Sequence, residues 1–266
     1  MKERQPRKFD GRQRQQLQPP VEENENQLEG RNALTEALRS GRTIDKVFIA
    51  SGDTDKALQR LAAQAKEAGA EIMPVDRRKL DMMSTTHSQQ GVIALVAARD
   101  YATIDEILEE AANRGQAPLI VICDELSDPH NLGAILRSAE CAGAHGVIIP
   151  KRRSVGLTAT VAKASAGAVE YMKVARVTNL NAAMEELKQK GVWIFGTAAE
   201  GSVPMYQADL TGPTAIVIGS EGDGMSRLVR ENCDVTVHIP MSGKINSLNA
   251  SAASTVLLYE AVRQRL

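Results

Sequence analysis

The sequence predicts an α/β fold whose core is a parallel β-sheet. Short apolar runs such as LIVIC (119–123) and AIVI (215–218) recur along the chain, and amphipathic segments with helical spacing separate them. Strands that read as continuous apolar runs are typical of parallel sheets, which helices cover on both faces. With 266 residues, of which 43% are hydrophobic, the chain is long enough for one large or two small domains with a buried core.

The composition excludes several classes of function. The three cysteines form no CxxC pair and the four histidines have no metal-ligand spacing, so neither a disulfide framework nor a metal site is predicted. Residues 1–20 lack the apolar stretch of a secretory signal, and no apolar run approaches the roughly 18 residues that span a membrane. A cytoplasmic protein without membrane contact is expected. The net charge of -1 does not by itself indicate a nucleic-acid partner.

Residues 1–26 are predicted to form a disordered basic tail. They are rich in glutamine, asparagine and arginine, they are almost free of apolar side chains, and basic residues outnumber acidic ones over residues 1–14. Two interpretations stay open. The segment either only improves solubility, or it acts as an electrostatic arm for a polyanion such as RNA.

Residues 27–98 are predicted to form a small α/β domain, because helical periodicity alternates with short apolar runs. Nothing in this domain indicates a catalytic cluster. Its helices are expected over 30–40, 54–68 and 77–83, and its strands over 46–50, 71–75 and 91–97.

Residues 99–117 are expected to hold a linker and a helix over 104–113, and residues 118–266 form a second α/β domain. Sites of parallel sheets lie at the carboxyl ends of the strands, so the residues that follow each strand are the candidates for a site. The strands are expected at 119–124, 146–149, 192–197, 215–219 and 235–239, and the helices at 132–144, 158–169, 181–190, 226–232 and 247–264.

The first polar cluster, DELSDPHNLGAILR (124–137), follows the strand LIVIC and combines Asn131, Gly133 and Arg137 as N-x-G-x-x-x-R. Taken alone, this motif is also compatible with a capped helix whose arginine reaches solvent.

The second cluster, GSEGDGM (219–225), has the spacing G-x-x-G-x-G, which differs from the phosphate-binding G-x-G-x-x-G. Its carboxylates, Glu221 and Asp223, would repel a phosphate, so a neutral or cationic ligand fits better. A plain tight turn is the alternative.

The third cluster lies in IPMSGKINSLNASAASTVLLYE (239–260) and leads into a helix rich in small residues, with Ser247 or Asn249 as the expected cap. A tightly packed helix explains the small residues. It does not explain why three polar clusters follow strands of one sheet, and this coincidence predicts a common site.

These clusters together resemble the three motifs of the SpoU-type RNA ribose methyltransferases of the SPOUT class. The matching residues are N-x-G-x-x-x-R-x-A (131–139), G-S-E-G-x-G (219–224), and I-P-M followed by S-L-N-x-S (239–241, 247–251). The resemblance covers residues 118–266 and implies a sheet whose C-terminal part forms a trefoil knot. It also implies S-adenosylmethionine held in a bent form, and an obligate homodimer whose active site takes residues from both subunits.

The segment LEGRNALTEALRSGRTIDKVFIASG (28–52) resembles the ribosomal-protein-like RNA-binding domain of the RlmB-like subgroup. This subgroup methylates the ribose 2′-hydroxyl of a guanosine in 23S ribosomal RNA. The same chemistry on a transfer RNA or on another ribosomal nucleotide stays open, as does a catalytically inactive RNA-binding module. The glycine spacing disfavours a dinucleotide-binding domain.

The resemblance also assigns roles to individual residues. Arg137 would position and polarise the ribose 2′-oxygen, since an arginine is nearly always protonated. Ser247 and Asn249 would orient Arg137 or the ribose by hydrogen bonds, and Asn131 would fix the loop of the first motif and touch the substrate. The cofactor pocket would be formed by six residues: Gly219, Ile239 and Leu248 through their backbone, and Thr197, Glu221 and Met241 by lining it.

RNA recognition has a weaker signal. Aromatic residues make up only 3% of the chain, so base stacking is not expected as a general mode. The basic run Lys151–Arg153 follows the strand 146–149, and it is either a phosphate contact near the pocket or an ordinary solvated loop.

Overall fold

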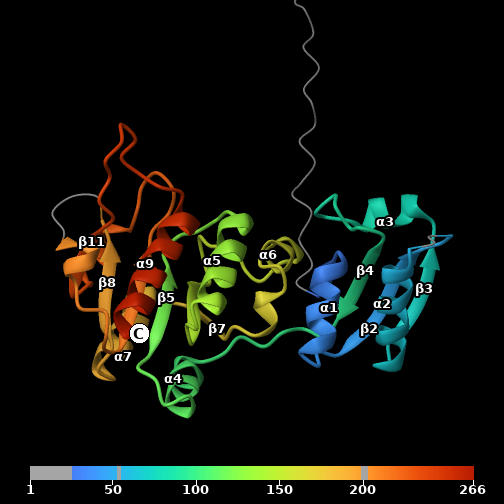
Figure 1. Cartoon of the computed structure of the whole chain (residues 1–266), viewed down its shortest axis with the longest axis horizontal. Coiled ribbons are helices and arrows are strands. Elements are labelled where there is room, and N and C mark those ends of the chain that lie inside the picture. The colour runs from blue at the N-terminus through green and yellow to red at the C-terminus, as the bar shows by residue number, and fades with distance from the viewer. Residues whose placement is uncertain (1–25, 53–54, 199–202) are drawn as a thin grey trace, which may run out of the picture.

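The computed structural model describes residues 26–52, 55–198 and 203–266, so all but Asn26 of the expected basic tail lies outside the described residues. The chain forms two sheets side by side (Figure 1). The first has four strands in the order β1-β4-β2-β3, and the second has seven in the order β7-β6-β5-β10-β8-β11-β9. The predicted α/β class is therefore confirmed.

The N-terminal sheet is mixed. β2 pairs with β3 in parallel, whereas β4 runs antiparallel to both β1 and β2. β1, β2 and β3 therefore run in one direction, and the helix that follows each of them begins at the same edge of the sheet. The strands are β1 (Gln27–Glu29), β2 (Ile44–Ala50), β3 (Glu71–Val75) and β4 (Val92–Val96), and the helices are α1 (Arg31–Arg39), α2 (Lys56–Glu67) and α3 (Arg77–Met83).

All pairings of the seven-stranded sheet are parallel. Its strands are β5 (Leu119–Cys123), β6 (Gly146–Pro150), β7 (Val174–Val177), β8 (Trp193–Thr197), β9 (Val203–Pro204), β10 (Thr214–Ile218) and β11 (Val235–His238). Its helices are α4 (Ile104–Asn113), α5 (Pro129–Cys141), α6 (Ala159–Ala164), α7 (Leu180–Gln189), α8 (Arg227–Glu231) and α9 (Ala250–Arg265).

Helices cover both faces of this sheet, as the apolar strands require. In β5, the side chains of Leu119, Val121 and Cys123 pack with α5 and α9, whereas Ile120 and Ile122 pack with α4 and α7. This alternation follows from the two-residue period of a strand. Among the described helices, none is both long and apolar enough to span a membrane.

The structure differs from the predicted elements most clearly at three short strands and three helices. The helix expected over 132–144 lies at Pro129–Cys141. β1, β7 and β9 were not expected, and they are three, four and two residues long. The last helix begins at Ala250 rather than Ser247, because the Asn249 side chain accepts the first free amides. The helix expected over 158–169 ends at Ala164, and a 3-10 turn follows.

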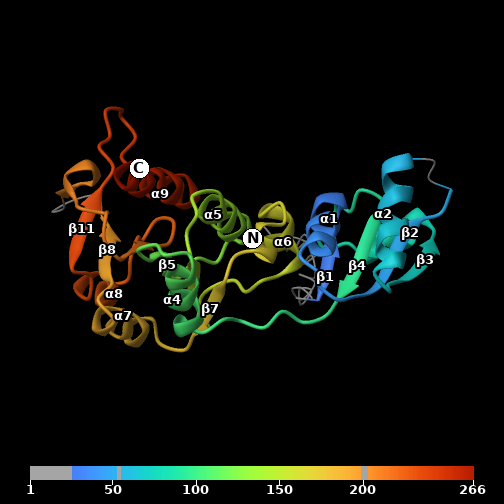
Figure 2. The same cartoon turned by 60° about the horizontal axis from the view of Figure 1, so that its bottom comes forward.

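The strand order reverses between β5 and β10. β6 and β7 lie on one side of this pair, and β8, β11 and β9 lie on the other. Such a switch point opens a crevice at the carboxyl ends of the strands. After β11 the chain returns across the sheet, and α9 packs on α5 and β10 (Figures 1 and 2). The trefoil knot itself stays a prediction.

A buried ion cluster joins the two sheets. The carboxylate of Glu170, whose side chain is 2% exposed, binds Arg42 at 2.9 Å and Arg99 at 3.0 Å. Lys163 donates to the carbonyl of Ser88 at 2.6 Å, and the Tyr171 hydroxyl donates to Glu36 at 2.6 Å. Arg42, Arg99, Glu36 and Ser88 lie outside the C-terminal sheet domain, so these contacts fix one domain against the other.

Candidate active site

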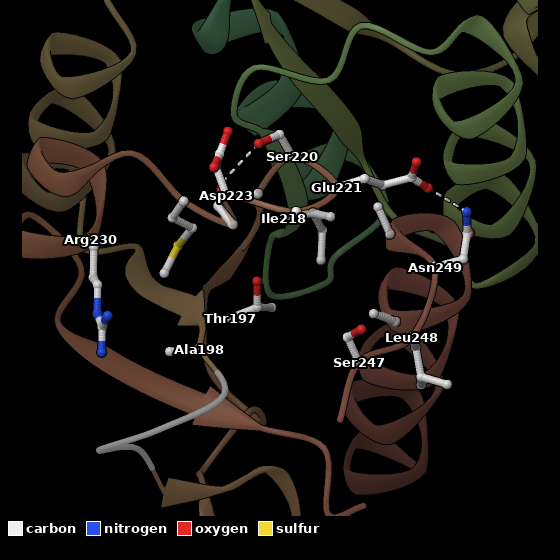
Figure 3. A pocket seen from close by; sticks show the side chains of 16 residues that line it. Thr197, Ala198, Ile218, Ser220, Glu221, Asp223, Arg230, Ser247, Leu248 and Asn249 are labelled. Atoms are coloured by element: carbon white, nitrogen blue, oxygen red, sulfur yellow. Dashed lines mark hydrogen bonds between the residues drawn. The ribbon is translucent and has the colours of Figure 1, made fainter. Parts of the chain in front are cut away.

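Two adjoining cavities lie at the carboxyl ends of β8, β10 and β11, beside the switch point. Their volumes are about 600 Å³ and 550 Å³. Figure 3 shows Thr197 and Ile218 between the loop after β10 and the start of α9. Both cavities are lined by Thr197, Ala198, Ser247, Leu248 and Ala253, so they form one continuous site.

The three polar clusters meet in a hydrogen-bond network beside the larger cavity. The Asn131 amide donates to Oε1 of Glu221 at 2.7 Å, and the Asn249 amide donates to the same oxygen at 2.6 Å. Asn249 also donates to Oδ1 of Asn131 at 2.9 Å. One residue from each motif thus takes part, and the predicted meeting of Asn131, Glu221 and Asn249 is visible in the structure.

Asn249 has a second function in this network. Its side-chain oxygen accepts hydrogen bonds from the backbone of Ser251 at 3.0 Å and of Ala252 at 3.3 Å, which caps α9. Its amide nitrogen faces Glu221 (Figure 3). The helix cap therefore fixes the amide toward the carboxylate.

Gly219 is required by a close approach of two backbone segments. A Cβ atom at this position would lie 2.2 Å from the carbonyl carbon of Gly224 and 2.3 Å from the amide of Met225. Ser220 and Gly224 close the loop, since the backbone amide of each donates to the carbonyl of the other, at 2.9 and 3.1 Å. The glycine thus allows the loop to fold back on itself beside the cavity.

Asp124 holds this loop to β5 and was not among the predicted site residues. It is 4% exposed, and its carboxylate accepts the Ser226 amide at 2.7 Å. Its own amide donates to the carbonyl of Ile218 at 2.8 Å. Asp124 follows β5 directly, so the rule that sites lie after parallel strands gave a signal for it.

All six residues expected to form the cofactor pocket line the cavities. Gly219 and Glu221 line the larger one, and Ile239 and Met241 line the smaller one. Thr197, Leu248 and the predicted catalytic residue Ser247 line both.

Arg137 lies apart from this group. Its side chain is exposed on α5, lines neither cavity, and contacts no described residue by a hydrogen bond or ion pair. It follows Asn131 by six residues in the same helix. Six residues advance a helix by about 9 Å and turn it by about 600°, so the two side chains point about 120° apart. Within one chain, the structure does not bring Arg137 to the cavity.

Side chains of both charges line the larger cavity. Glu221 and Asp223 lie on the loop after β10, and Arg230 reaches the rim from α8 (Figure 3). Burial raises the pKa of the Cys123 and Cys233 thiols to about 12, so neither supplies a thiolate at neutral pH. Among the described residues no cluster of metal-ligating side chains occurs. The carboxylates of Glu221 and Asp223 suit a ligand with cationic groups at their side of the cavity.

A solved structure with this architecture defines the class. This structure is the SpoU methyltransferase AviRb from Streptomyces viridochromogenes in complex with the cofactor AdoMet. The structural match covers 90% of this chain and 89% of the AviRb chain. The TM-score is 0.79 and the sequence identity is 27%. The fold is therefore that of the SPOUT methyltransferases, preceded by an N-terminal substrate-binding domain.

Sequence comparison narrows the class to a family. Residues 118–259 match the SpoU rRNA Methylase family, and residues 27–102 match the RNA 2′-O ribose methyltransferase substrate-binding family. A putative TrmH family tRNA/rRNA methyltransferase, YacO of Bacillus subtilis (strain 168), is 49% identical over 236 residues, which cover 89% of this chain and 94% of the relative.

A 23S rRNA (guanosine-2′-O-)-methyltransferase, RlmB of Ralstonia nicotianae, is 46% identical over 240 residues, covering 90% and 95% of the two chains. The chain belongs to the SpoU/TrmH family of RNA 2′-O-ribose methyltransferases, whose cofactor is S-adenosylmethionine.

The residues of this site fit that cofactor. S-adenosylmethionine carries a sulfonium and an ammonium but no phosphate, so it is compatible with the carboxylates of Glu221 and Asp223. The joined cavities have the size of a typical small-molecule site. Gly219 lies at the wall of the larger cavity, where the absence of a side chain lets the loop pack back on itself.

Proposed function

We propose that this protein transfers a methyl group from S-adenosylmethionine to the ribose 2′-hydroxyl of a guanosine in 23S ribosomal RNA, in the cytoplasm. The network of Asn131, Glu221 and Asn249 carries the proposal, because it joins all three motifs beside a cavity of about 600 Å³. The guanosine and the 23S RNA rest on the similarity to the RlmB of Ralstonia nicotianae. Residues 27–98 would bind the RNA and residues 118–266 would carry the reaction.

Each residue of the site has a stated part in this proposal. The backbone at Gly219, Ile239 and Leu248 would hold the cofactor, and Thr197 and Met241 would line its pocket. When bound, S-adenosylmethionine supplies an electrophilic methyl group. Holding the ribose oxygen in line with that group removes much of the entropic barrier to transfer.

One carboxylate oxygen of Glu221 has no described hydrogen-bond partner and is available to the bound molecules. Both of its described hydrogen bonds end on Oε1. Oε2 is thus able to accept a hydrogen bond from a hydroxyl or ammonium of the bound molecules. Asn131 and Asn249 keep the carboxylate in place, and Ser247 lines both cavities, where its hydroxyl would orient the ribose.

We further propose that Arg137 acts in the active site of a partner subunit in a homodimer. Arg137 is exposed on α5 and lines neither cavity of its own chain. Apolar side chains are exposed on the adjoining α9 and on the loop before it: Tyr259 is 48% exposed, Ile245 72% and Met241 40%. An isologous interface across this surface would bury them and place each arginine near the cavity of the other subunit.

Subunit mixing tests this arrangement. Arg137→Ala and Asn249→Ala chains are each expected to lose methyl transfer. Co-refolded in equal amounts, they should regain roughly a quarter of the wild-type activity, because half of the dimers then contain one intact composite site. If Arg137 instead acts within its own chain, no mixed dimer has an intact site and the mixture stays inactive.

The substrate is tested separately. Methyl transfer from tritiated S-adenosylmethionine is measured with transcripts of 23S ribosomal RNA and of transfer RNA, and the labelled nucleoside is then mapped. A 2′-O-methylguanosine confined to the ribosomal transcript supports the proposal. Label in transfer RNA, or in a different nucleoside, contradicts it. The absence of any label would indicate a binding module.

A further inference from the structure

Four basic side chains lie at one edge of the N-terminal sheet. β2 and β3 run in parallel, so α2 and α3, which follow them, begin at the same edge. Lys56 is the first residue of α2, and Arg77, Arg78 and Lys79 are the first three residues of α3. All four are exposed. We call this group the edge patch.

The cations of the edge patch form no ion pair with the described part of the chain. None of its four side chains forms an ion pair or hydrogen bond with a described residue, whereas Lys46 binds Glu71 at 3.0 Å and Arg39 binds Glu36 at 2.8 Å near the opposite edge. The carboxylates of Asp55 and Asp76, which lie beside the edge patch, accept backbone amides as helix caps, and Asp55 also pairs with Arg31.

Helix stability does not account for these cations. The first turn of a helix favours acidic side chains, because the helix dipole is positive there. Arg77, Arg78 and Lys79 all lie in the first turn of α3, which has no acidic residue in that turn. Their placement costs stability in this helix, and an anionic partner outside the chain would offset the cost.

The edge patch lies on the same side of the molecule as the active site. In Figures 1 and 2 the arrowheads of β3 and of β11 point to the same side, so the carboxyl edges of the two sheets face one way. The Glu170 ion cluster keeps the two domains in this orientation. Lys151 and Arg152, exposed after β6, lie at the carboxyl edge of the larger sheet and extend the positive charge toward the cavity.

We propose that the edge patch binds the phosphate backbone of the RNA whose ribose enters the active site, so that one RNA lies across both domains. The proposal rests on the proposed RNA substrate and names the surface that holds it. Exposed cations without partners in the described chain suit phosphate contacts, which set affinity and register but not base identity. Specificity for the RNA sequence would then come from other contacts between the protein and the RNA.

The test compares two triple variants with equal changes of charge. Arg77→Gln/Arg78→Gln/Lys79→Gln removes three cations of the edge patch, and Arg39→Gln/Lys46→Gln/Lys66→Gln removes three from the opposite end of the same domain. Filter binding to a 23S ribosomal RNA transcript is measured over a range of salt concentrations. Calorimetry with S-adenosylmethionine and methyl transfer at saturating RNA are measured alongside.

The first triple variant is expected to raise the Kd for the transcript about 10- to 100-fold and to reduce the salt slope by about 2. Its cofactor affinity and its transfer rate at saturating RNA should match the wild type, and the control variant should change the Kd less than about threefold. Circular dichroism of all variants checks folding, and Lys56→Gln on the separate helix α2 should weaken binding in the same direction.

Equal weakening by both triple variants would show that only net charge matters and would overturn the proposal. An unchanged Kd in the first variant would also overturn the proposal. An acidic protein would then be the remaining candidate partner of the edge patch. These outcomes are independent of the reaction itself. If the wild type binds the transcript through the edge patch but methylates no RNA, the proposed function fails while the surface assignment holds.

Discussion

Glu170 and Glu221 show how differently one molecule uses a carboxylate. Glu170 is 2% exposed at the boundary between the domains, and each of its oxygens binds an arginine. Glu221 is exposed beside the active-site cavity, and both of its described hydrogen bonds end on a single oxygen. With both oxygens paired to arginines at a buried position, the Glu170 carboxylate holds structure together, whereas Glu221 keeps Oε2 without a described partner and is able to accept a ligand there.

The partners differ as well. Glu170 is held by two permanent charges, so its removal leaves charge buried. Glu221 is held by two neutral amides, which keep its position without cancelling its negative charge. The same residue type is thus structural at the domain boundary and ready for a cationic ligand at the cavity, and mutation should separate the two functions.

The largest effect is expected from Glu170→Ala. The side chains of Arg42 and Arg99 are 12% and 25% exposed and would lose their counter-charge. Removing one member of a buried ion cluster typically costs about 3–5 kcal/mol. Urea unfolding should therefore show a large loss, whereas Glu71→Ala, in the exposed pair with Lys46, should lose less than about 1 kcal/mol. Equal losses of unfolding free energy in the two variants would contradict a special structural role of Glu170.

A smaller effect, on binding rather than stability, is expected from Glu221→Gln. The amide keeps the shape of the side chain but removes its charge, and hydrogen bonds to charged groups are stronger by about 1–2 kcal/mol. Calorimetry should show the Kd for S-adenosylmethionine rising about tenfold. The control is Glu231→Gln, an exposed carboxylate on α8. Unchanged affinity in Glu221→Gln would contradict a role for the charge in cofactor binding.

The smallest effect is expected from Glu29, another buried carboxylate at the domain boundary, which is 1% exposed. Burial raises its pKa, but hydrogen bonds from Ser84, Thr86, Thr85 and Gln27 outweigh this and hold the pKa below the usual 4.5. Its stabilising contribution is therefore full above that value and is lost as the pH falls through the lower, folded-state pKa.

Glu29→Gln should cost about 1 kcal/mol at pH 7. The difference in unfolding free energy between wild type and variant should then shrink between pH 5 and pH 3. A difference that stays constant over this range would show that the charge of Glu29 does not contribute.

The sequence predicted the alternation of strands and helices and the joint site, because both depend on local patterns. Carboxyl ends of parallel strands share an edge, so polar residues after several strands were expected to meet there. The pairing of β5 with β10 was not predicted, since strands almost a hundred residues apart leave no local signal for their order. β1, β7 and β9 were missed because they are too short to show a period.

Two positions show where sequence reasoning stops. Arg99 belongs to a segment read as a linker, yet it is ion-paired with a buried glutamate, and a single charged residue in a sequence gives no indication of such a distant partner. Arg137 and Asn131 share one motif but lie on different faces of α5, so proximity in sequence did not imply proximity in the site.

The double use of Asn249 couples the folding of helix α9 to the geometry of the site. The carboxylate at the cavity is held by an amide whose other end caps this sixteen-residue helix. Fraying of the first turn of α9 would therefore also release Glu221, so local unfolding of one helix end and loss of order at the cavity become a single event.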